Sequence, residues 1–149
     1  EGVESQGASG EGTRLTWADA IGAAIEVRRL DDADALVALL AERPRGLVPP
    51  LLRAELARAR ALIAWVRDEP DGVEPGLRSA IDELAALGYP FWLARAQIDL
   101  AAWLTERGRS SEAASLVDEA AGTLERLGAA PALARARRVM APEAEPATP

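Results

Sequence analysis

Acidic residues gathered in two short stretches are the side chains of this sequence whose type and spacing could do chemistry. The first stretch, DDAD at residues 31–34, could hold a metal ion through carboxylate oxygens, but these acids also suit the first turn of a helix. The second, DEPDGVEPG at residues 68–76, lacks the ligand spacing of an EF-hand and is typical of a solvated connection. We therefore expect no metal ion and no other cofactor at either stretch.

The residue types that are missing exclude most classes of enzyme. The chain has no histidine and no cysteine, and all 17 of its basic residues are arginine. Without histidine and cysteine it cannot form the usual nucleophile pairs or the usual zinc sites. Without lysine it has neither a Schiff base nor a P-loop lysine. Carboxylate-only catalysis and an all-oxygen metal site stay open, but we expect a chain that is not itself an enzyme.

The length and charge distribution predict a single helical domain between two acidic ends. A chain of 149 residues supports one core. The ends at residues 1–12 and 142–149 are Gly/Ser- or Pro-rich and acidic, and we expect disorder there and order over residues 13–141. The net charge of −7 comes largely from these ends, so bulk electrostatics do not predict nucleic-acid binding. No apolar run is long enough to span a membrane, and a cytoplasmic piece of a longer protein is expected.

Between the ends the sequence predicts about seven helices and no strand. Their expected N-caps are Thr16, Asp31 or Asp32, and Ser110, while prolines open others and glycines end them. The predicted helices cover about residues 16–29, 31–43, 51–68, 76–87, 90–108, 110–128 and 131 onward. Trp17, Trp65 and Trp103 are expected in the core.

An internal repeat links these helices. LGYPFWLARA at residues 87–96 returns as LGAAPALARA at 127–136, and a weaker copy, PPLLRAEL, stands at residues 49–56. Each copy predicts the end of one helix, a Leu-Gly pair that terminates it and the start of the next helix. The glycine is expected to be left-handed, and the leucine before it to pack inward. A period of about 40 with two helices per unit is typical of an α-solenoid.

The helix faces fit stacked antiparallel hairpins. The helix at 110–128 is apolar on one half and polar on the other, as expected of an outer helix. The helix at 90–108 is apolar almost all round, apart from a narrow strip of Arg95, Asp99 and Glu106, as expected of an inner helix covered on both sides. We therefore expect inner and outer helices to alternate in an all-α fold.

Two stretches carry a family resemblance. DLAAWLTERGRSSEAASLVDEA, with Leu100, Leu104, Gly108 and Ala113 at matching places, resembles a tetratricopeptide-type (TPR) repeat with a longer period. More broadly, LGYPFWLARAQIDLAAWL and the residues after it resemble the C-terminal tails of actinobacterial signalling proteins. These proteins join a class III adenylate/guanylate cyclase domain, an AAA-type ATPase domain and a TPR-like array. The resemblance implies that this chain is a TPR-like α-solenoid. It also implies that any cyclase or ATPase activity belongs to other domains of the parent protein.

Two functions follow as expectations. The first is a non-catalytic module that binds a protein or peptide, or upstream domains of its own polypeptide. The alternative is a small-molecule sensor with a pocket between inner helices. Weak self-association is expected from an apolar face near Trp17, Ile21 and Ile25.

Arginines at a regular spacing of two helical turns mark the candidate binding surface. Arg53, Arg60 and Arg67 form one stripe on the third predicted helix. In the repeat alignment this stripe is expected beside the strip headed by Arg95 and Asp99, with Trp92 and Trp103 at its edge. One interpretation is a groove for an acidic peptide or carboxylate. The other is plain ion pairing, Arg60 with Asp99 and Arg67 with Glu106.

Overall fold

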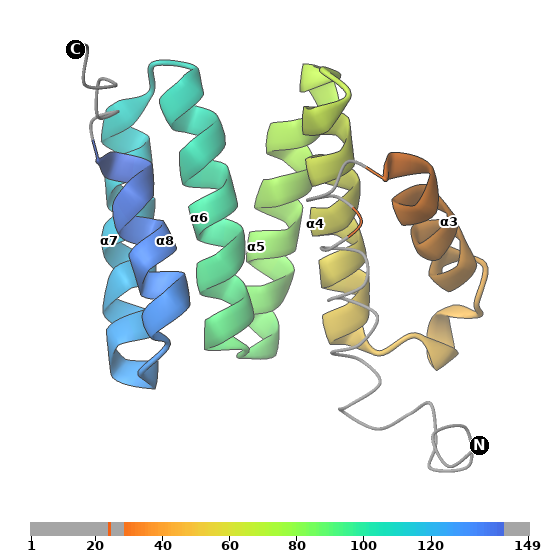
Figure 1. Ribbon diagram of the computed structural model, residues 1–149. Helices are drawn as coiled ribbons and strands as arrows, with labels where there is room; N and C mark the ends of the chain where they lie inside the picture. The colour runs from red at the N-terminus through yellow and green to blue at the C-terminus, as the bar shows by residue number, and fades with distance from the viewer. Residues whose placement is uncertain (1–23, 25–28, 142–149) are drawn as a thin grey trace. The chain divides into compact units, whose positions relative to one another are not determined.

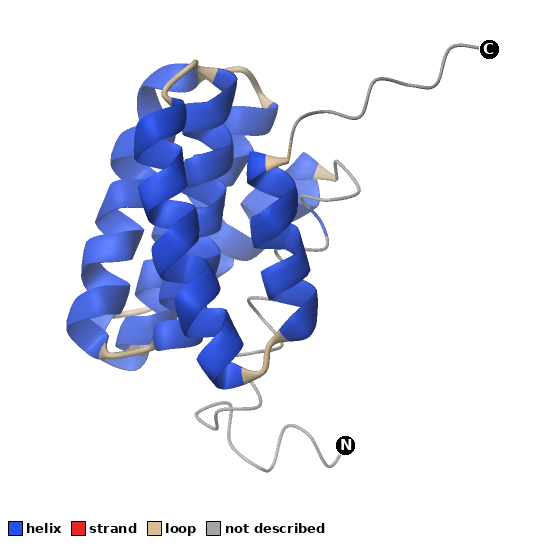
Figure 2. Ribbon diagram, turned by 90° about the vertical axis from the view of Figure 1, so that its left-hand side faces the viewer, coloured by secondary structure: helices blue, strands red, loops and turns tan. Residues whose placement is uncertain are grey.

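The chain is helical throughout the residues whose structure is defined. The computed structural model describes residue 24 and residues 29–141, and these contain six α-helices, two short 3₁₀ helices and no strand (Figures 1 and 2). The all-α prediction is confirmed there, whereas most of the predicted helix at 16–29 lies outside the described residues. None of the described helices is long and apolar enough to cross a membrane. The chain divides into two compact units, Glu1–Ser79 and Ala80–Pro149, each described by itself below.

The observed helices match six of the predicted ones to within a few residues. Pro50 and Pro90 are each the first residue of a helix, as predicted, because a proline at that position gives up no helical hydrogen bond. The elements in chain order are α3 (Leu30–Ala41), η1 (Arg45–Leu47), α4 (Pro50–Val66), η2 (Pro70–Gly72), α5 (Val73–Leu87), α6 (Pro90–Glu106), α7 (Ser110–Leu127) and α8 (Ala130–Met140). Helix α5 runs through the division between the two units.

Burial recurs along the chain at a constant interval. Three segments, 31–40, 71–80 and 111–120, bury side chains at their third, seventh and tenth positions. The starts of α4, α6 and α8, at Pro50, Pro90 and Ala130, are separated by the same interval. The buried residues that recur are Ala33, Val37 and Leu40, then Val73, Leu77 and Ala80, then Ala113, Val117 and Ala120. The repeat period expected from the sequence is therefore also present in the helix boundaries and in the core positions.

The left-handed residues that end the helices also repeat. Gly88 and Gly128 have φ of 74° and 69°, and Gly108 has φ of 76°, as predicted for helix-terminating glycines. The fourth member of the set is Asp68, which precedes Gly108 by the interval that separates Gly88 from Gly128 and has φ of 59°. Each end closes with the same pair of backbone hydrogen bonds. At Gly88, for example, the N–H of Tyr89 donates to the carbonyl of Leu84 and that of Gly88 to the carbonyl of Ala85.

The leucine before each glycine does not pack inward, so that prediction is wrong. Leu87 is 38% exposed and Leu127 is 49% exposed. The residues that fill the core at these helix ends lie three positions earlier, where Leu84 and Leu124 are fully buried. A residue three positions back lies on the same face of the helix as the preceding core residue, whereas the last residue has already rotated toward solvent.

The predicted N-caps Asp31 or Asp32 and Ser110 are also wrong. Helices α3 and α7 begin after Arg29 and Arg109, and neither N-cap residue makes a side-chain capping hydrogen bond. The carbonyls of these two arginines accept the first helical hydrogen bonds, so the acids fall within the first turn. Arg109 instead forms a forked pair with Glu112, at 2.8 and 2.9 Å, across the helix start. A first-turn acid also favours the positive end of the helix dipole.

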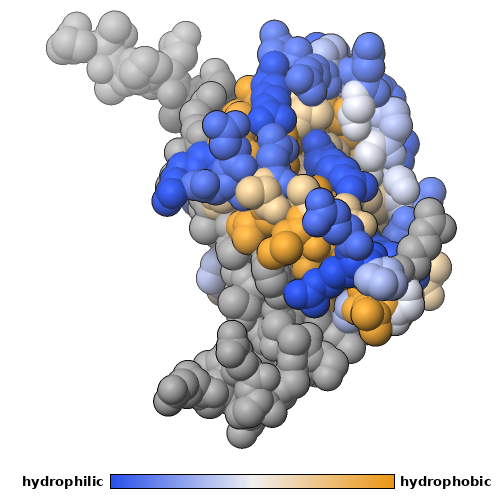
Figure 3. Space-filling model, turned by 90° about the vertical axis from the view of Figure 1, so that its right-hand side faces the viewer, coloured by the Kyte–Doolittle hydropathy of each residue, from blue (hydrophilic) through white to orange (hydrophobic). Residues whose placement is uncertain are grey.

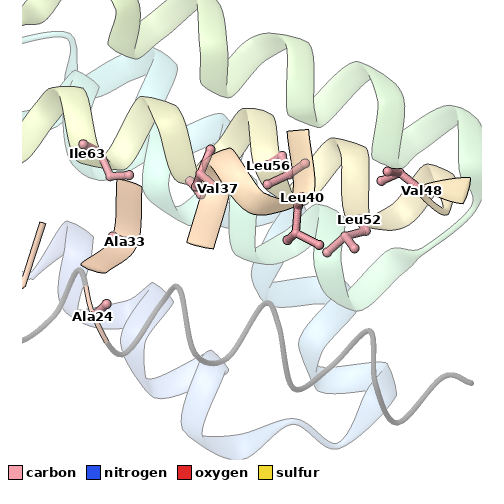
Figure 4. Packing of buried hydrophobic residues seen from close by; sticks show 9 residues of the cluster. Ala24, Ala33, Val37, Leu40, Val48, Leu52, Leu56 and Ile63 are labelled. Atoms are coloured by element: carbon pink, nitrogen blue, oxygen red, sulfur yellow. The ribbon is translucent and has the colours of Figure 1, made fainter. Parts of the chain in front are cut away.

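The first unit has its core between α3 and α4. Ala33, Val37 and Leu40 of α3 form one buried cluster with Leu52, Leu56 and Ile63 of α4, and Figure 4 shows these residues together. Ala24 is 9% exposed and belongs to the same cluster. Leu39, at 47% exposure, and Leu47, at 70%, are left outside the core. Figure 3, which shows the face at the right of Figure 1, has apolar surface bordered by hydrophilic side chains.

Gly76 allows α5 to approach α4 closely within the first unit. A Cβ at this position would lie 2.9 Å from the Cβ of Ala61, closer than two carbon atoms normally come. The sequence predicts a helix start at Gly76, but α5 begins at Val73 and Gly76 lies inside its first turns. This glycine is therefore a contact residue and does not begin a helix.

In the second unit α6 is the covered helix. It packs against α7 and α8, and α7 packs against α8 (Figure 1). Helix α6 buries ten of its 17 residues, whereas α7 buries four of 18, namely Ala113, Val117, Ala120 and Leu124. The predicted contrast between an inner helix at 90–108 and an outer one at 110–128 is thus confirmed.

Candidate interaction surface

Two exposed arginines stand on helix α4, which is buried over much of its length. Nine of its 17 residues are buried, yet Arg53 and Arg60 are exposed. Their spacing of two helical turns puts them on one face, roughly 10 Å apart along the helix axis. Neither makes an ion pair with another of the described residues. We call Arg53 and Arg60 the α4 arginine pair.

Arg67, the third predicted member of this stripe, is held by α3. Its Nη2 donates to the Oδ2 of Asp34 and lies 3.9 Å from the Oδ1 of Asp31. The hydrogen bond to Asp34 and the nearby carboxylates raise the pKa of the Arg67 guanidinium above its ordinary value. Within the first unit these acids of α3 are its partners. The DDAD stretch thus contributes ion pairs to the packing of α3 on α4.

The structure brings Trp92 and Arg95 together on α6. The guanidinium carbon of Arg95 lies 5.2 Å from the centre of the Trp92 ring and 5.9 Å from that of Phe91. The two rings meet edge to face, with their centres 5.8 Å apart. Trp92 is only 8% exposed. Stacking on this pair of rings restricts the rotamers of Arg95 and orients its guanidinium.

Asp99 lies in the interior and pairs with a residue that the sequence analysis did not single out. It is 1% exposed, and its Oδ1 accepts a hydrogen bond of 2.5 Å from the Nη2 of Arg135 on α8. Arg135 takes the same place in the second copy of the Leu-Ala-Arg-Ala motif that Arg95 takes in the first. That repeat could have marked it as a candidate, but a pair so far apart in the sequence leaves no local signal.

Trp103 is a buried residue, as predicted. It is 5% exposed, and the guanidinium carbon of Arg107 lies 3.9 Å from the centre of its ring. Trp65, predicted for the core, is partly buried, and Trp17 lies outside the described residues. Because Trp92 and Trp103 are both covered, these indoles support neighbouring guanidinium groups and offer little ring surface to a ligand.

A second buried charged pair lies within α4. Glu55 is 5% exposed and Arg58 8% exposed, and the Nη1 of Arg58 donates to the Oε2 of Glu55 over 3.2 Å. The sequence does not predict this pair, because two charges one turn apart usually indicate a solvated helix face. In α6 Gln97 is also buried and donates to Glu119 of α7 over 3.0 Å.

The acidic stretches show no metal-site geometry within the described part of the chain. No group of three or more His, Cys, Asp or Glu side chains is arranged there to hold a metal ion. Asp32 pairs with Arg29 at 2.6 Å, and Glu74 pairs with Arg78 at 2.8 Å. An open depression at the start of α3 is lined by residues 29–32 and includes the Arg29–Asp32 pair.

Comparison with protein-family models, with curated proteins and with solved structures finds no match for this chain. What is established is therefore an all-helical domain with six described helices. Helices adjacent in sequence account for most of the packing between its elements.

Proposed function

We propose that this chain is a non-catalytic, TPR-like helical repeat module that mediates protein–protein or intramolecular interactions. In line with its resemblance, it belongs to a larger signalling protein of the cyclase or ATPase type. The regular recurrence of helix ends and buried positions supports a repeat module. Repeat modules present extended surfaces, and their specificity depends on the side chains placed there.

The observation that carries this proposal is the α4 arginine pair. Arg53 and Arg60 are exposed on a helix that is mostly buried, and neither is neutralised by an acid among the described residues. Guanidinium groups bind carboxylates through two parallel hydrogen bonds, and arginine is enriched among residues that dominate binding energy. The partner is therefore an acidic peptide segment or protein surface.

Arg95 offers a further guanidinium, in the other unit. Its stacking on Trp92 and Phe91 fixes the side chain before a ligand arrives, which lowers the entropy cost of binding. Trp92 acts through Arg95, since the indole itself is buried.

Binding to synthetic peptides of equal length and acidic, neutral or basic composition tests the proposal. Acidic peptides should bind, and Arg53→Glu with Arg60→Glu should weaken binding by about tenfold or more, since a hydrogen bond to a charged group contributes about 1.5–3 kcal/mol. Arg126→Glu with Arg138→Glu is the matched control, because both arginines are also exposed on helices and the net charge changes by the same amount. The variant with Arg53→Glu and Arg60→Glu should melt within a few degrees of the parent chain.

Two results would contradict this function. One is the absence of any preference for acidic over neutral and basic peptides. The other is an equal loss of binding in the control with Arg126→Glu and Arg138→Glu, which would mean that net charge alone causes the effect. A metabolite that raises the melting temperature of both variants and the parent alike would favour the alternative of a small-molecule sensor.

A further inference from the structure

Helix α8 is attached to the second unit by little apolar burial. It packs on α6 and α7, as Figure 1 shows, but Ala136 is its one fully buried residue. It starts at the repeat position equivalent to the start of α6, yet α8 is shorter, with 11 residues where α6 has 17. Helix α6 buries ten residues. A short helix with few buried apolar contacts belongs to the low-stability end of a structure and opens locally more readily than the rest.

Helices α7 and α8 carry opposite charges, and α8 forms ion pairs with both α6 and α7. Helix α7 has four acids and one arginine, whereas α8 has three arginines and no acid. Arg137 of α8 pairs with Glu125 of α7 at 3.2 Å, and both side chains are more than half exposed. The acids of α7 are Glu112, Asp118, Glu119 and Glu125, and the arginines of α8 are Arg135, Arg137 and Arg138.

The buried carboxylate of Asp99 on α6 binds one of the arginines of α8. Arg135 reaches it from the surface, since its own side chain is 43% exposed while that of Asp99 is 1% exposed. A hydrogen bond between two charged groups in a covered site is stronger and more selective in geometry than one in solvent. Arg135, Ala136 and Arg137 thus contact three features in succession: a buried carboxylate, an apolar core and an exposed carboxylate.

We propose that α8 is an exchangeable occupant of its place on α6 and α7, and that a partner's arginine-bearing amphipathic helix binds there instead. We call this place, marked by Asp99 and Glu125, the acceptor surface. Its ligand is a helix with arginine, a small residue and arginine in succession, docked by helix-in-groove recognition. The inference rests on the proposed interaction function but concerns the second unit alone, whereas the α4 arginine pair lies in the first.

A labelled synthetic peptide of residues 129–141 is the probe. The full chain with Arg135→Gln should bind this peptide at least about tenfold more tightly than the parent chain does, because in the parent the tethered α8 competes at a high effective concentration. A peptide with Arg135→Gln should bind the full chain that carries Arg135→Gln about tenfold more weakly than the unchanged peptide does. The matched peptide with Arg138→Gln carries the same charge change at an exposed position and should bind like the unchanged one.

Three outcomes would overturn the proposal. The first is that the folded Arg135→Gln chain fails to bind the peptide. The second is that the two altered peptides lose binding equally, which would indicate attraction by net charge alone. The third is a dimer of the parent chain that the peptide dissociates, since the acceptor surface would then take α8 of a second copy. If Arg135→Gln does not fold, amide hydrogen exchange of the parent chain decides. Amides of α8 should exchange at least about tenfold faster than those of α6, and equal rates contradict an exchangeable helix.

Discussion

Replacing the left-handed glycines tests the helix ends most directly, because the added Cβ makes no packing contact that would change the stability. A Cβ added at Gly108 would meet no atom within 4 Å, although φ there is 76°. The cost of Gly108→Ala is therefore that of the backbone alone, about 1–2 kcal/mol for a non-glycine residue in this region. The smaller entropy of the unfolded alanine chain offsets roughly 0.4–1 kcal/mol. We expect a net loss of about 0.5–1 kcal/mol.

Gly122→Ala is the matched control in the same unit. Gly122 lies within α7 without a left-handed φ, and its added Cβ would make only an ordinary contact with Arg126, at 3.7 Å. Alanine in a helix interior is more stable than glycine by about 0.5–1 kcal/mol. The two Gly→Ala changes should thus have opposite signs and differ by about 1–2 kcal/mol.

Urea denaturation followed by circular dichroism measures both differences. The order of midpoints, from highest to lowest, should be Gly122→Ala, parent, Gly108→Ala. Asp68→Gly extends the test to the first unit, where an aspartate takes the equivalent left-handed position at the end of α4. This change should stabilise the chain by up to about 1 kcal/mol, because it removes both the backbone cost and a negative charge from a helix C-terminus. Should Gly108→Ala prove as stable as Gly122→Ala, the helix does not end in a left-handed residue and the reasoning fails.

Four further predictions follow from the core and from the residue types. Leu124→Ala should cost about 2–5 kcal/mol and Leu127→Ala less than about 0.5 kcal/mol in urea denaturation, since only Leu124 is buried. Gly76→Ala should lower the urea midpoint, because its Cβ would lie 2.9 Å from that of Ala61; a raised midpoint would mean that α5 shifts freely. Incubated with ATP or GTP and Mg²⁺ or Mn²⁺, the purified chain should form no cyclic nucleotide and release no phosphate. Turnover that is lost when residues of the chain itself are mutated would contradict this prediction. Sedimentation should show weak self-association, which a strict monomer at high concentration would refute. The face predicted for it at Trp17, Ile21 and Ile25 lies outside the described residues, and Leu39 and Leu47 are further exposed apolar residues of the first unit.

The helix boundaries were predictable because they depend on local signals. Pro50, Pro90, Gly88 and Gly128 restrict the backbone at their own positions, and the structure uses each as the sequence predicts. The N-caps of α3 and α7 were not predictable, because the arginines that start these helices do so through backbone carbonyls that leave no side-chain signature. Which leucine of a helix end is buried also depends on the rotation of the helix against its neighbours.

The candidate site was predictable in its residues and unpredictable in its pairing. Arg95, Trp92 and Asp99 lie on α6, where the sequence places them. Their partners, and those of the α4 stripe, come from elements that only the fold brings close. Arg135 reaches Asp99 from α8, and in the first unit α3 supplies the acids that hold the last arginine of the stripe.

The contrast between what repeats and what does not supports an interaction function. The starts of α4, α6 and α8, the left-handed ends and the core positions return at one constant interval, so they carry the common architecture of each hairpin. None of the four charged residues of α4 recurs with the same charge at the equivalent position of α6. Arg53 and Arg60 of α4 are replaced by leucines at the equivalent positions of α6, and Asp99 of α6 stands where α4 has an alanine. The repeated architecture requires neither a carboxylate nor an arginine pair at these positions, since the equivalent positions of the other helix carry apolar residues. These non-repeating charges are therefore the residues in which the recognition of a particular partner is expected to reside, Asp99 for a basic helix and the α4 arginine pair for an acidic segment.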